Sequence, residues 1–217
     1  MNLEIWSGVA AGIVTTLQMT ALGFIGGAIL GIPVLFLRIS KIAPLRWVGR
    51  TFIEIIRGIP LLVWLFLIYN GPTQFNPSLS SIFTSFNSAV IALAVVSSVY
   101  MAENYRGALS AISKNQWEAG GALGLTQTDT ARFVIAPQVV RVVIPSAANY
   151  AISLLKDSSL VSAIGVFEIT YYATNLSATT SSATPFYVAG VYYLIMTIPS
   201  AWAARKLDAR LRSKVER

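Results

Sequence analysis

One polar, glycine-bearing stretch interrupts this mostly apolar chain: Gln116-Trp117-Glu118-Ala119-Gly120-Gly121-Ala122-Leu123-Gly124-Leu125, continued by Ile135-Ala136-Pro137-Gln138. Residues 116–122 are compatible with a helix, and Gly124 suits the left-handed residue that ends one. Thr126 or Thr128 is placed to cap a second helix, with Asp129 in its first turn. The stretch therefore predicts a compact helix–turn–helix between two hydrophobic segments.

The composition of the whole chain indicates an integral membrane protein. Of its 217 residues 55% are hydrophobic and only 12% are charged, and the mean hydropathy is +0.65. Soluble domains carry roughly 25% charged residues. The chain has no cysteine and no histidine, which removes disulfides, thiol chemistry and the commonest metal ligand. We therefore expect neither a metal site nor a cofactor, and the composition argues against an enzyme.

Charge-free segments predict an all-α, polytopic protein with about five transmembrane helices in a single domain covering residues 1–217. A helix needs about 20 apolar residues to cross a bilayer. The expected spans are 12–36, 54–70, 88–109, 142–161 and 185–204. No charge occurs from Ile5 to Leu37, and no basic residue precedes this run, so we expect a retained first span rather than a cleaved signal peptide. Residues 169–184, rich in Thr, Ser, Tyr and Asn, are interpreted as an external loop.

Glycines at four-residue spacing in the first span predict close packing against another helix. They are Gly8, Gly12, Gly23, Gly27 and Gly31. Small residues at this spacing let helices approach in lipid, although glycine is also simply common in membrane helices.

The basic residues predict the orientation. Of the 16 Lys and Arg, five lie in the gap 38–57, four in the gap 103–141 and six in the tail, and Lys156 alone lies in the remaining gaps. The positive-inside rule then places the N-terminus outside, the C-terminus inside and Glu118 in the cytoplasm. The net charge of +7 is thus a topology signal, and no nucleic-acid partner is expected.

The opening stretch resembles the "EAA loop" of permease subunits of ATP-binding-cassette (ABC) importers. The matching residues are Glu118, Ala119, Gly124, Ile135 and Pro137. The chain departs from the pattern at Gly120 and Ala136, where a second Ala and a Leu are usual. The resemblance implies that residues 113–138, the coupling segment, form a cytoplasmic loop that docks on an ATPase through Glu118, Ala119, Gly120, Gly124 and Pro137. Glu118 either pairs with a basic group of the ATPase or caps its own helix.

Three further blocks resemble signatures of polar amino-acid permeases of the histidine, glutamine, arginine and cystine type. They are Arg57-Gly58-Ile59-Pro60-Leu61-Leu62, Ala102-Glu103-Asn104-Tyr105-Arg106-Gly107 and Leu154-Leu155-Lys156-Asp157-Ser158-Ser159-Leu160-Val161-Ser162-Ala163-Ile164-Gly165. The structural positions of these signatures are Arg57, Gly58, Pro60, Arg106, Gly107 and Gly165. In that family the third block borders the translocation pathway and its gate, and the fold is that of type I importer permeases.

Ionisable residues near the spans are candidates for the substrate pathway. Lys156 and Asp157 lie either near or beyond mid-depth of the bilayer or, if their helix ends at Leu155, in the outer interface. Asp157 is placed to meet the ammonium group of an amino acid. The remaining candidates for polar contacts to the substrate are Ser158, Ser97, Ser98 and Tyr100.

Two pairs of opposite charge stand at helical spacing. Glu103 and Arg106 form either an intrahelical ion pair or a substrate contact, and Glu54 and Arg57 are also spaced to pair.

The chain contains no phosphate-binding loop for ATP, so energy has to come from a partner. The resemblance implies a second permease subunit, two cytoplasmic ABC ATPases that carry ATP and magnesium, an extracytoplasmic binding protein and a location in the prokaryotic plasma membrane. The implied function is import of a polar or charged amino acid by alternating access. A secondary transporter or channel that works alone remains the alternative, and inverted repeats or broken helices would favour it.

Overall fold

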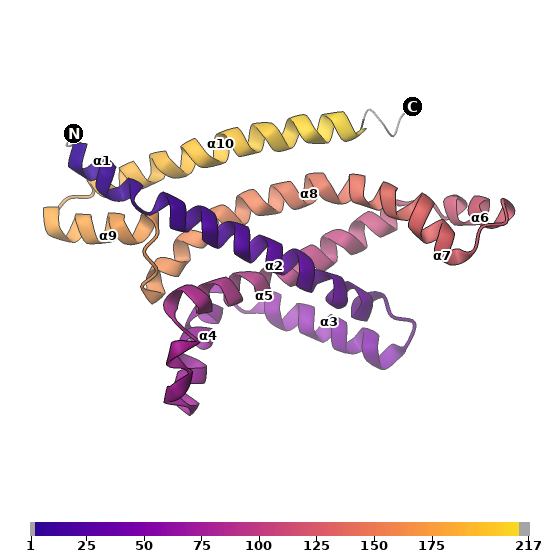
Figure 1. Cartoon of the computed structure of the whole chain (residues 1–217), viewed down its shortest axis with the longest axis horizontal. Coiled ribbons are helices and arrows are strands. Elements are labelled where there is room, and N and C mark those ends of the chain that lie inside the picture. The colour runs from indigo at the N-terminus through magenta and orange to yellow at the C-terminus, as the bar shows by residue number, and fades with distance from the viewer. Residues whose placement is uncertain (1–2, 213–217) are drawn as a thin grey trace.

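The computed structural model describes residues 3–212 and consists of helices packed along one long axis (Figure 1). Lys214 and Arg217, counted above with the basic tail, lie outside the described residues. In chain order the described helical segments are α1 (Leu3–Ala10), α2 (Ile13–Ile39), α3 (Ala43–Gly58), α4 (Leu61–Phe75), η1 (Pro77–Ser81), α5 (Ser85–Ala111), α6 (Lys114–Ala122), α7 (Gln127–Asp129), η2 (Thr130–Ile135), α8 (Ala136–Asp157), η3 (Ser158–Ile164), α9 (Ile169–Thr180) and α10 (Thr184–Arg212).

Within the described residues, four helical stretches are long and apolar enough to cross a membrane. They are Leu3–Ile39, Ser85–Ala111, Gln127–Ile164 and Thr184–Arg210. A fifth span results if α3 and α4, which meet at 99°, are counted as one broken helix.

The glycine face of α2 packs directly on α5, which confirms the close approach expected from the spacing. A Cβ on Gly23 would lie 2.6 Å from Cβ of Leu93, and one on Gly27 would overlap Ser97. Tyr105 adds a polar link, since its hydroxyl donates to the carbonyl of Ala28 at 2.9 Å. Lipid is as apolar as the helices, so no hydrophobic effect drives two helices together within a bilayer. Close packing of α2 on α5 therefore holds the pair together.

The break between α3 and α4 follows from Pro60. Proline has no N–H, so the carbonyl of Ile56 lacks its partner four residues on. The indole nitrogen of Trp64 donates to that carbonyl instead, at 3.2 Å. The sequence predicted one span at 54–70; the structure places this sharp bend inside that range, and α4 then packs against α5 and η3 with Leu65 fully buried (Figure 1).

The segment after α8 differs from the expected external loop. The chain tightens into the 3₁₀ segment η3, turns at Gly165 with φ +81°, and then forms the helix α9. The prediction of a loop over 169–184 was therefore wrong for Ile169–Thr180. A helix forms because the carboxylate of Glu168 caps it, accepting from the backbone N–H of Thr170 and of Tyr171, each at 2.8 Å.

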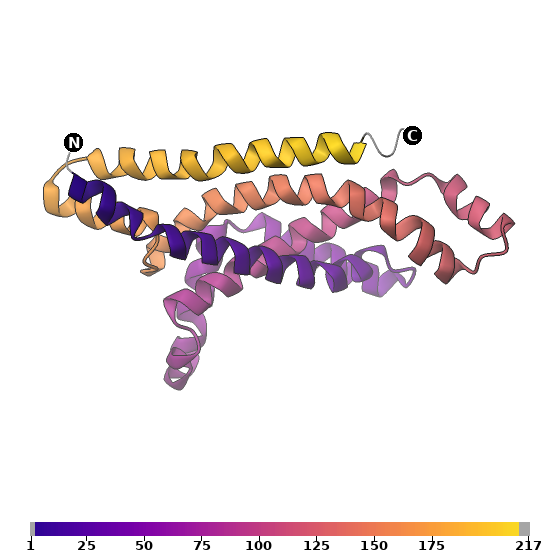
Figure 2. The same cartoon turned by 45° about the horizontal axis from the view of Figure 1, so that its top comes forward.

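The helices α1 and α9 and the first turns of α10 gather at one end of the long axis, and α6 to η2 lie at the other (Figure 1). The first group shares a small apolar core formed by Val9, Ile169, Ala173, Val188 and Ala189. Beyond that core α10 is largely exposed and runs beside α8 (Figure 2).

Candidate coupling and translocation sites

The coupling segment has the helix–turn–helix form that the sequence predicts. The side chain of Ser113 caps α6, and Gly124 adopts a left-handed φ of +78° just after it. Thr126 accepts from the N–H of Asp129 at 3.1 Å and so caps the second helix, which selects it over Thr128. The following residues form a π-helical turn, η2, a feature that is frequent at functional sites.

Gly120, the first departure from the resembled pattern, has a physical reason in this fold. Thr130 is buried against it, and a Cβ on Gly120 would lie 2.5 Å from the hydroxyl oxygen of Thr130. An alanine here would force α6 away from η2. The pair Gly120 and Thr130 therefore sets how closely the two arms of the coupling segment pack.

Apolar side chains are exposed on the coupling segment. The exposed fraction is 40% for Trp117, 80% for Leu123 and 64% for Phe133. Glu118 makes no hydrogen bond or ion pair with any described residue, and the cap of α6 is Ser113, so Glu118 does not cap its own helix. Such an apolar surface at one end of the molecule is typical of a site that binds another protein.

Two stacked tyrosine rings and one arginine side chain connect the three helices α3, α5 and α8. Tyr100 of α5 stacks on Tyr150 of α8 with ring centroids 5.1 Å apart. The hydroxyl of Tyr150 donates to the hydroxyl of Ser97 at 3.0 Å. The guanidinium of Arg57, at the end of α3, lies 4.8 Å from the ring centroid of Tyr100 and forms a cation–π contact. The expected pair of Glu54 with Arg57 is not formed.

Two of the candidate serines, Ser98 and Ser158, form hydrogen bonds within the chain. The hydroxyl of Ser98 donates to the carbonyl of Val95 at 2.6 Å, and its backbone faces Gly31 of α2. Ser158 is fully buried, donates to the carbonyl of Leu155 at 2.7 Å and accepts from Thr20 at 3.5 Å. Both hydroxyls thus bind a backbone carbonyl three residues before them.

Lys156 and Asp157 close α8, and both are exposed. Asp157 stands two helical turns from Tyr150, and seven residues bring both to the same side of α8. The structure thus groups Arg57, Tyr100, Tyr150 and Ser97, with Asp157 further along the same face of α8. The sequence missed Tyr150, although its position seven residues before Asp157 was the signal that could have found it.

Glu103 joins two helices. Its carboxylate binds Nε of Arg38 from α2 at 3.2 Å and Arg106 of its own helix at 2.8 Å. The intrahelical pair that the spacing allowed is formed, and Arg38 is an addition that only the fold reveals. With two guanidinium partners, Glu103 stabilises the α2–α5 contact rather than standing free in a cavity.

Glu168 is a buried carboxylate whose structural role the sequence did not reveal. Its side chain has 0% exposure and accepts from the hydroxyl of Tyr193 at 2.9 Å in addition to its two backbone donors. Burial raises the pKa of this carboxyl, and the three donors oppose that shift in part. The backbone of Gly12 lies against the Glu168–Ile169 peptide so closely that a Cβ would overlap it.

The remaining signature positions are defined by the backbone. Gly165 holds the left-handed turn after η3, and Pro60 is the N-cap residue that directly precedes α4. A Cβ on Gly58 or on Gly107 would meet nothing within 4 Å. Nothing in the described residues explains why glycine stands at these two positions.

Comparison with known families matches residues 23–213 to the binding-protein-dependent transport system inner membrane component. The chain belongs to this family. Four relatives of the chain are ABC transporter permease proteins from Bacillus subtilis, Vibrio harveyi and Haemophilus influenzae. The membrane helices and the coupling segment are thus those of a permease component.

Individual relatives and solved structures agree with this family. The chain is 42% identical over 173 residues to the L-cystine transport system permease protein TcyB of Bacillus subtilis, covering 80% of this chain and 72% of that protein. It is 36% identical to the glutamine transport system permease protein GlnP of Escherichia coli K12, covering 91% and 90%.

The fold matches a chain of a structure described as an amino acid ABC transporter with histidines, with a TM-score of 0.87, 33% identity and coverage of 97% and 100%. A chain of the MetNI methionine ABC transporter in inward-facing conformations matches with a TM-score of 0.81 and 22% identity, covering 97% and 99%, which shows the shared fold.

Proposed function

We propose that this chain is the membrane-spanning permease subunit of an importer for a polar or charged amino acid, driven by separate ABC ATPases. The family match supports a transport component, and the named relatives support amino acids as the substrate class. The observation that carries the proposal is the coupling segment, which presents Trp117, Leu123 and Phe133 to a partner at one end of the helices. The assembly we propose has two permease subunits, two cytoplasmic ATPases and an extracytoplasmic binding protein in the prokaryotic plasma membrane.

The coupling segment transmits force and touches no substrate. Closure of the ATPases on ATP draws the two coupling segments together, and the helices rock between outward- and inward-open states. The tight contact of Gly120 with Thr130 supports this role because it keeps α6 and η2 moving as one body. The chain itself requires no cofactor, and ATP with magnesium is bound by the ATPase.

The substrate pathway runs along the face of α8 that carries Tyr150 and Asp157. A zwitterion in a medium of low dielectric needs a partner for each of its charges. Asp157 meets the ammonium group or a basic side chain, and Tyr100 and Ser97 contribute polar contacts beside it. Lys156 neighbours Asp157 at the same end of the path. The broken α3–α4 helix, which also occurs in transporters that work alone, is here part of an ABC permease fold.

The coupling role is tested by the substitution Gly124→Asp. Any L-residue at φ +78° is strained, so the turn opens and the exposed face changes shape. We expect the ATPase to be lost from affinity-purified complexes, or ATP hydrolysis to become independent of substrate. Gly71→Asp is the matched control because a Cβ there meets nothing within 4 Å and α4 lies away from the coupling segment. Wild-type ATPase binding and uptake in Gly124→Asp would refute the assignment.

The substrate role of Asp157 is tested in a reconstituted complex by Asp157→Asn. We expect uptake and substrate-stimulated ATP hydrolysis to fall about 10-fold or more, because one charge of the zwitterion loses its partner. Glu54→Gln, at an exposed carboxylate without an ion pair, should leave both unchanged. If Asp157→Asn behaves like the control, Asp157 lies outside the pathway. A screen of the common amino acids against ATP hydrolysis by the same complex identifies the substrate.

A further inference from the structure

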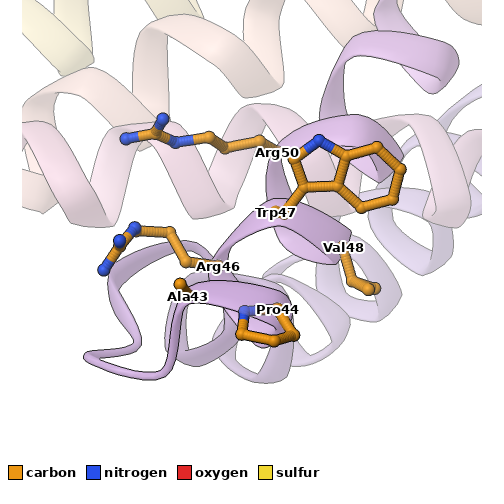
Figure 3. A pocket seen from close by; sticks show the side chains of 6 residues that line it. All are labelled: Ala43, Pro44, Arg46, Trp47, Val48 and Arg50. Atoms are coloured by element: carbon orange, nitrogen blue, oxygen red, sulfur yellow. The ribbon is translucent and has the colours of Figure 1, made fainter.

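The first two turns of α3 carry a basic hollow that the coupling and translocation sites do not use. Its volume is about 490 Å³ and it is lined by Ala43, Pro44, Arg46, Trp47, Val48 and Arg50 (Figure 3). Arg46 and Arg50 are one helical turn apart, and their side chains extend to the same side of the helix (Figure 3). We call this surface the α3 hollow.

The two guanidinium groups of the α3 hollow have no acidic partner among the described residues. Arg46 donates to the carbonyl of Ser40 at 3.0 Å, and Arg50 makes no hydrogen bond or ion pair with them. Like charges four residues apart on a helix repel each other. An anion held between them would remove that repulsion and satisfy several N–H donors at once.

The wall beside the arginines is apolar and faces outward. Gly49, Ile53 and Ile56 form the buried face of α3, and a Cβ on Gly49 would lie 2.8 Å from the backbone nitrogen of Arg38 at the end of α2. On the outer side the exposed fraction is 68% for Trp47 and 49% for Val48. α3 therefore has an apolar face toward α2 and another that no described element covers.

The level of the α3 hollow along the spans matches a membrane interface. It follows directly on the apolar run of α2, which ends at Ile39, and on the turn that precedes Ala43. Tryptophan side chains favour this level, and clustered arginines next to a span attract anionic lipids.

We infer that the α3 hollow binds the headgroup of an anionic phospholipid, with the phosphodiester between Arg46 and Arg50 and the glycerol and acyl chains against Val48, Pro44 and Trp47. An ATPase or a second permease copy fits less well, because the surface pairs unmatched positive charge with exposed aliphatic groups at the level of a bilayer interface. The lipid belongs to the inner leaflet if the gap 38–57 is cytoplasmic, as the positive-inside rule predicts from its five basic residues. The lipid contact itself does not depend on it.

The test measures retained lipid on the chain purified together with its ATPase. The complex is equilibrated in nanodiscs of phosphatidylcholine with a minor share of phosphatidylglycerol, and phosphatidylglycerol retained after extraction is counted by native mass spectrometry. We expect Arg46→Ala with Arg50→Ala to lower the selective retention about 25-fold, since each arginine contributes about five-fold. Arg50→Ala alone should show an intermediate loss, and because Arg50 is exposed and unpaired this variant keeps its fold. The pair Arg46→Lys and Arg50→Lys should retain part of the lipid because the charge remains.

Matched controls separate a specific site from general charge. Arg141→Ala with Arg205→Ala removes two exposed arginines from α8 and α10, outside the coupling segment, and should leave retention unchanged. Equal loss in both double variants, no loss in the α3 variant, or displacement of the lipid by inorganic phosphate would each overturn the proposal. Spontaneous disulfide-linked dimers of Val48→Cys in membranes would also overturn it, because a second copy would then occupy the surface. Since nanodisc binding does not involve transport or sidedness, failure here is distinguishable from failure of the proposed function.

Discussion

Glu168 shows how one residue joins separate parts of this fold. Among the described residues it is the charged side chain without solvent exposure, and it connects the start of α9 with Tyr193 of α10. Thr16 and Gly12 of the first span lie against the same junction, where the N–H of Ile169 donates to the hydroxyl of Thr16 at 3.4 Å. The carboxylate of Glu168 thereby fixes where α9 begins after the signature block that ends at Gly165.

Glu168→Ala is expected to destabilise the protein. The loss of a helix cap together with a charge-assisted hydrogen bond costs about 2–3 kcal/mol. The expected observation is a lower melting temperature in detergent, followed by intrinsic fluorescence. Glu54→Ala, at an exposed carboxylate without a partner, is the control and should change stability by less than about 0.5 kcal/mol. Equal melting temperatures for both variants would show that the Glu168 cap is not needed.

The titration of Glu168 makes stability depend on pH. Burial raises the pKa of its carboxyl above the ordinary value of 4.5. The folded state then holds the proton more tightly than the unfolded state, so this contribution is fully present below the ordinary pKa and is lost as the pH rises through the raised pKa. We expect the melting temperature of the wild type, relative to that of Glu168→Gln, to increase when the pH is lowered from about 7 to about 5. A difference that stays constant or falls over this range contradicts the raised pKa.

At the scale of elements, the α2–α5 pair and the α3–α4 break have different physical causes. The pair depends on the absence of side chains at Gly23 and Gly27, which lets backbones approach. The break depends on a missing N–H at Pro60, and Trp64 compensates for it by donating to the carbonyl of Ile56. The chain is helical on either side of this break, and the carbonyl of Ile56 stays hydrogen-bonded through the indole of Trp64.

Gly27→Leu tests the α2–α5 contact. A leucine side chain overlaps Ser97 and forces the two helices apart, at a cost of about 2–3 kcal/mol or more. We expect lower yield of folded protein on size-exclusion chromatography and a lower melting temperature. Gly190→Leu is the matched control on α10, where a Cβ meets nothing within 4 Å. If both variants behave alike, the close approach of α2 and α5 does not contribute to stability.

At the scale of the whole molecule, the basic residues of the two internal basic gaps gather toward one end of the long axis. Residues 38–57 and the coupling segment lie toward one end of the molecule, and α1 with α9 lies at the other (Figure 1). The charge-poor end includes Glu168 and the small apolar core around Ile169. This separation is the arrangement that the positive-inside rule requires of a chain with its coupling segment in the cytoplasm.

Orientation is tested by labelling single cysteines, which is simple because the chain contains none. Ser80→Cys and Asn115→Cys place one thiol each at exposed positions, after α4 and in α6. We expect a membrane-impermeant maleimide to label Ser80→Cys in intact spheroplasts and Asn115→Cys only after the membrane is opened. Labelling of both from the same side, or the reverse pattern, would refute the orientation.

The sequence by itself determined the features that depend on local chemistry. The left-handed Gly124 and the glycine face of α2 follow from residue type and short spacing. Spacing also named two threonines for the cap near Asp129 and offered an ion pair for Glu103 and Arg106, and the structure selected Thr126 and formed the pair. The family and the fold class also follow, because four signature blocks and the long apolar runs are local patterns.

Only the tertiary structure decided which distant groups meet. Tyr150 on Tyr100, Arg57 over the same ring, Arg38 on Glu103 and Thr130 against Gly120 join residues from different elements. The helix α9 escaped prediction because its Thr, Ser and Tyr side chains are weak helix formers, and its cap and core contacts come from Glu168 and from α1 and α10. Propensity and periodicity report on neighbours along the chain, whereas these contacts arise when helices far apart in sequence pack side by side.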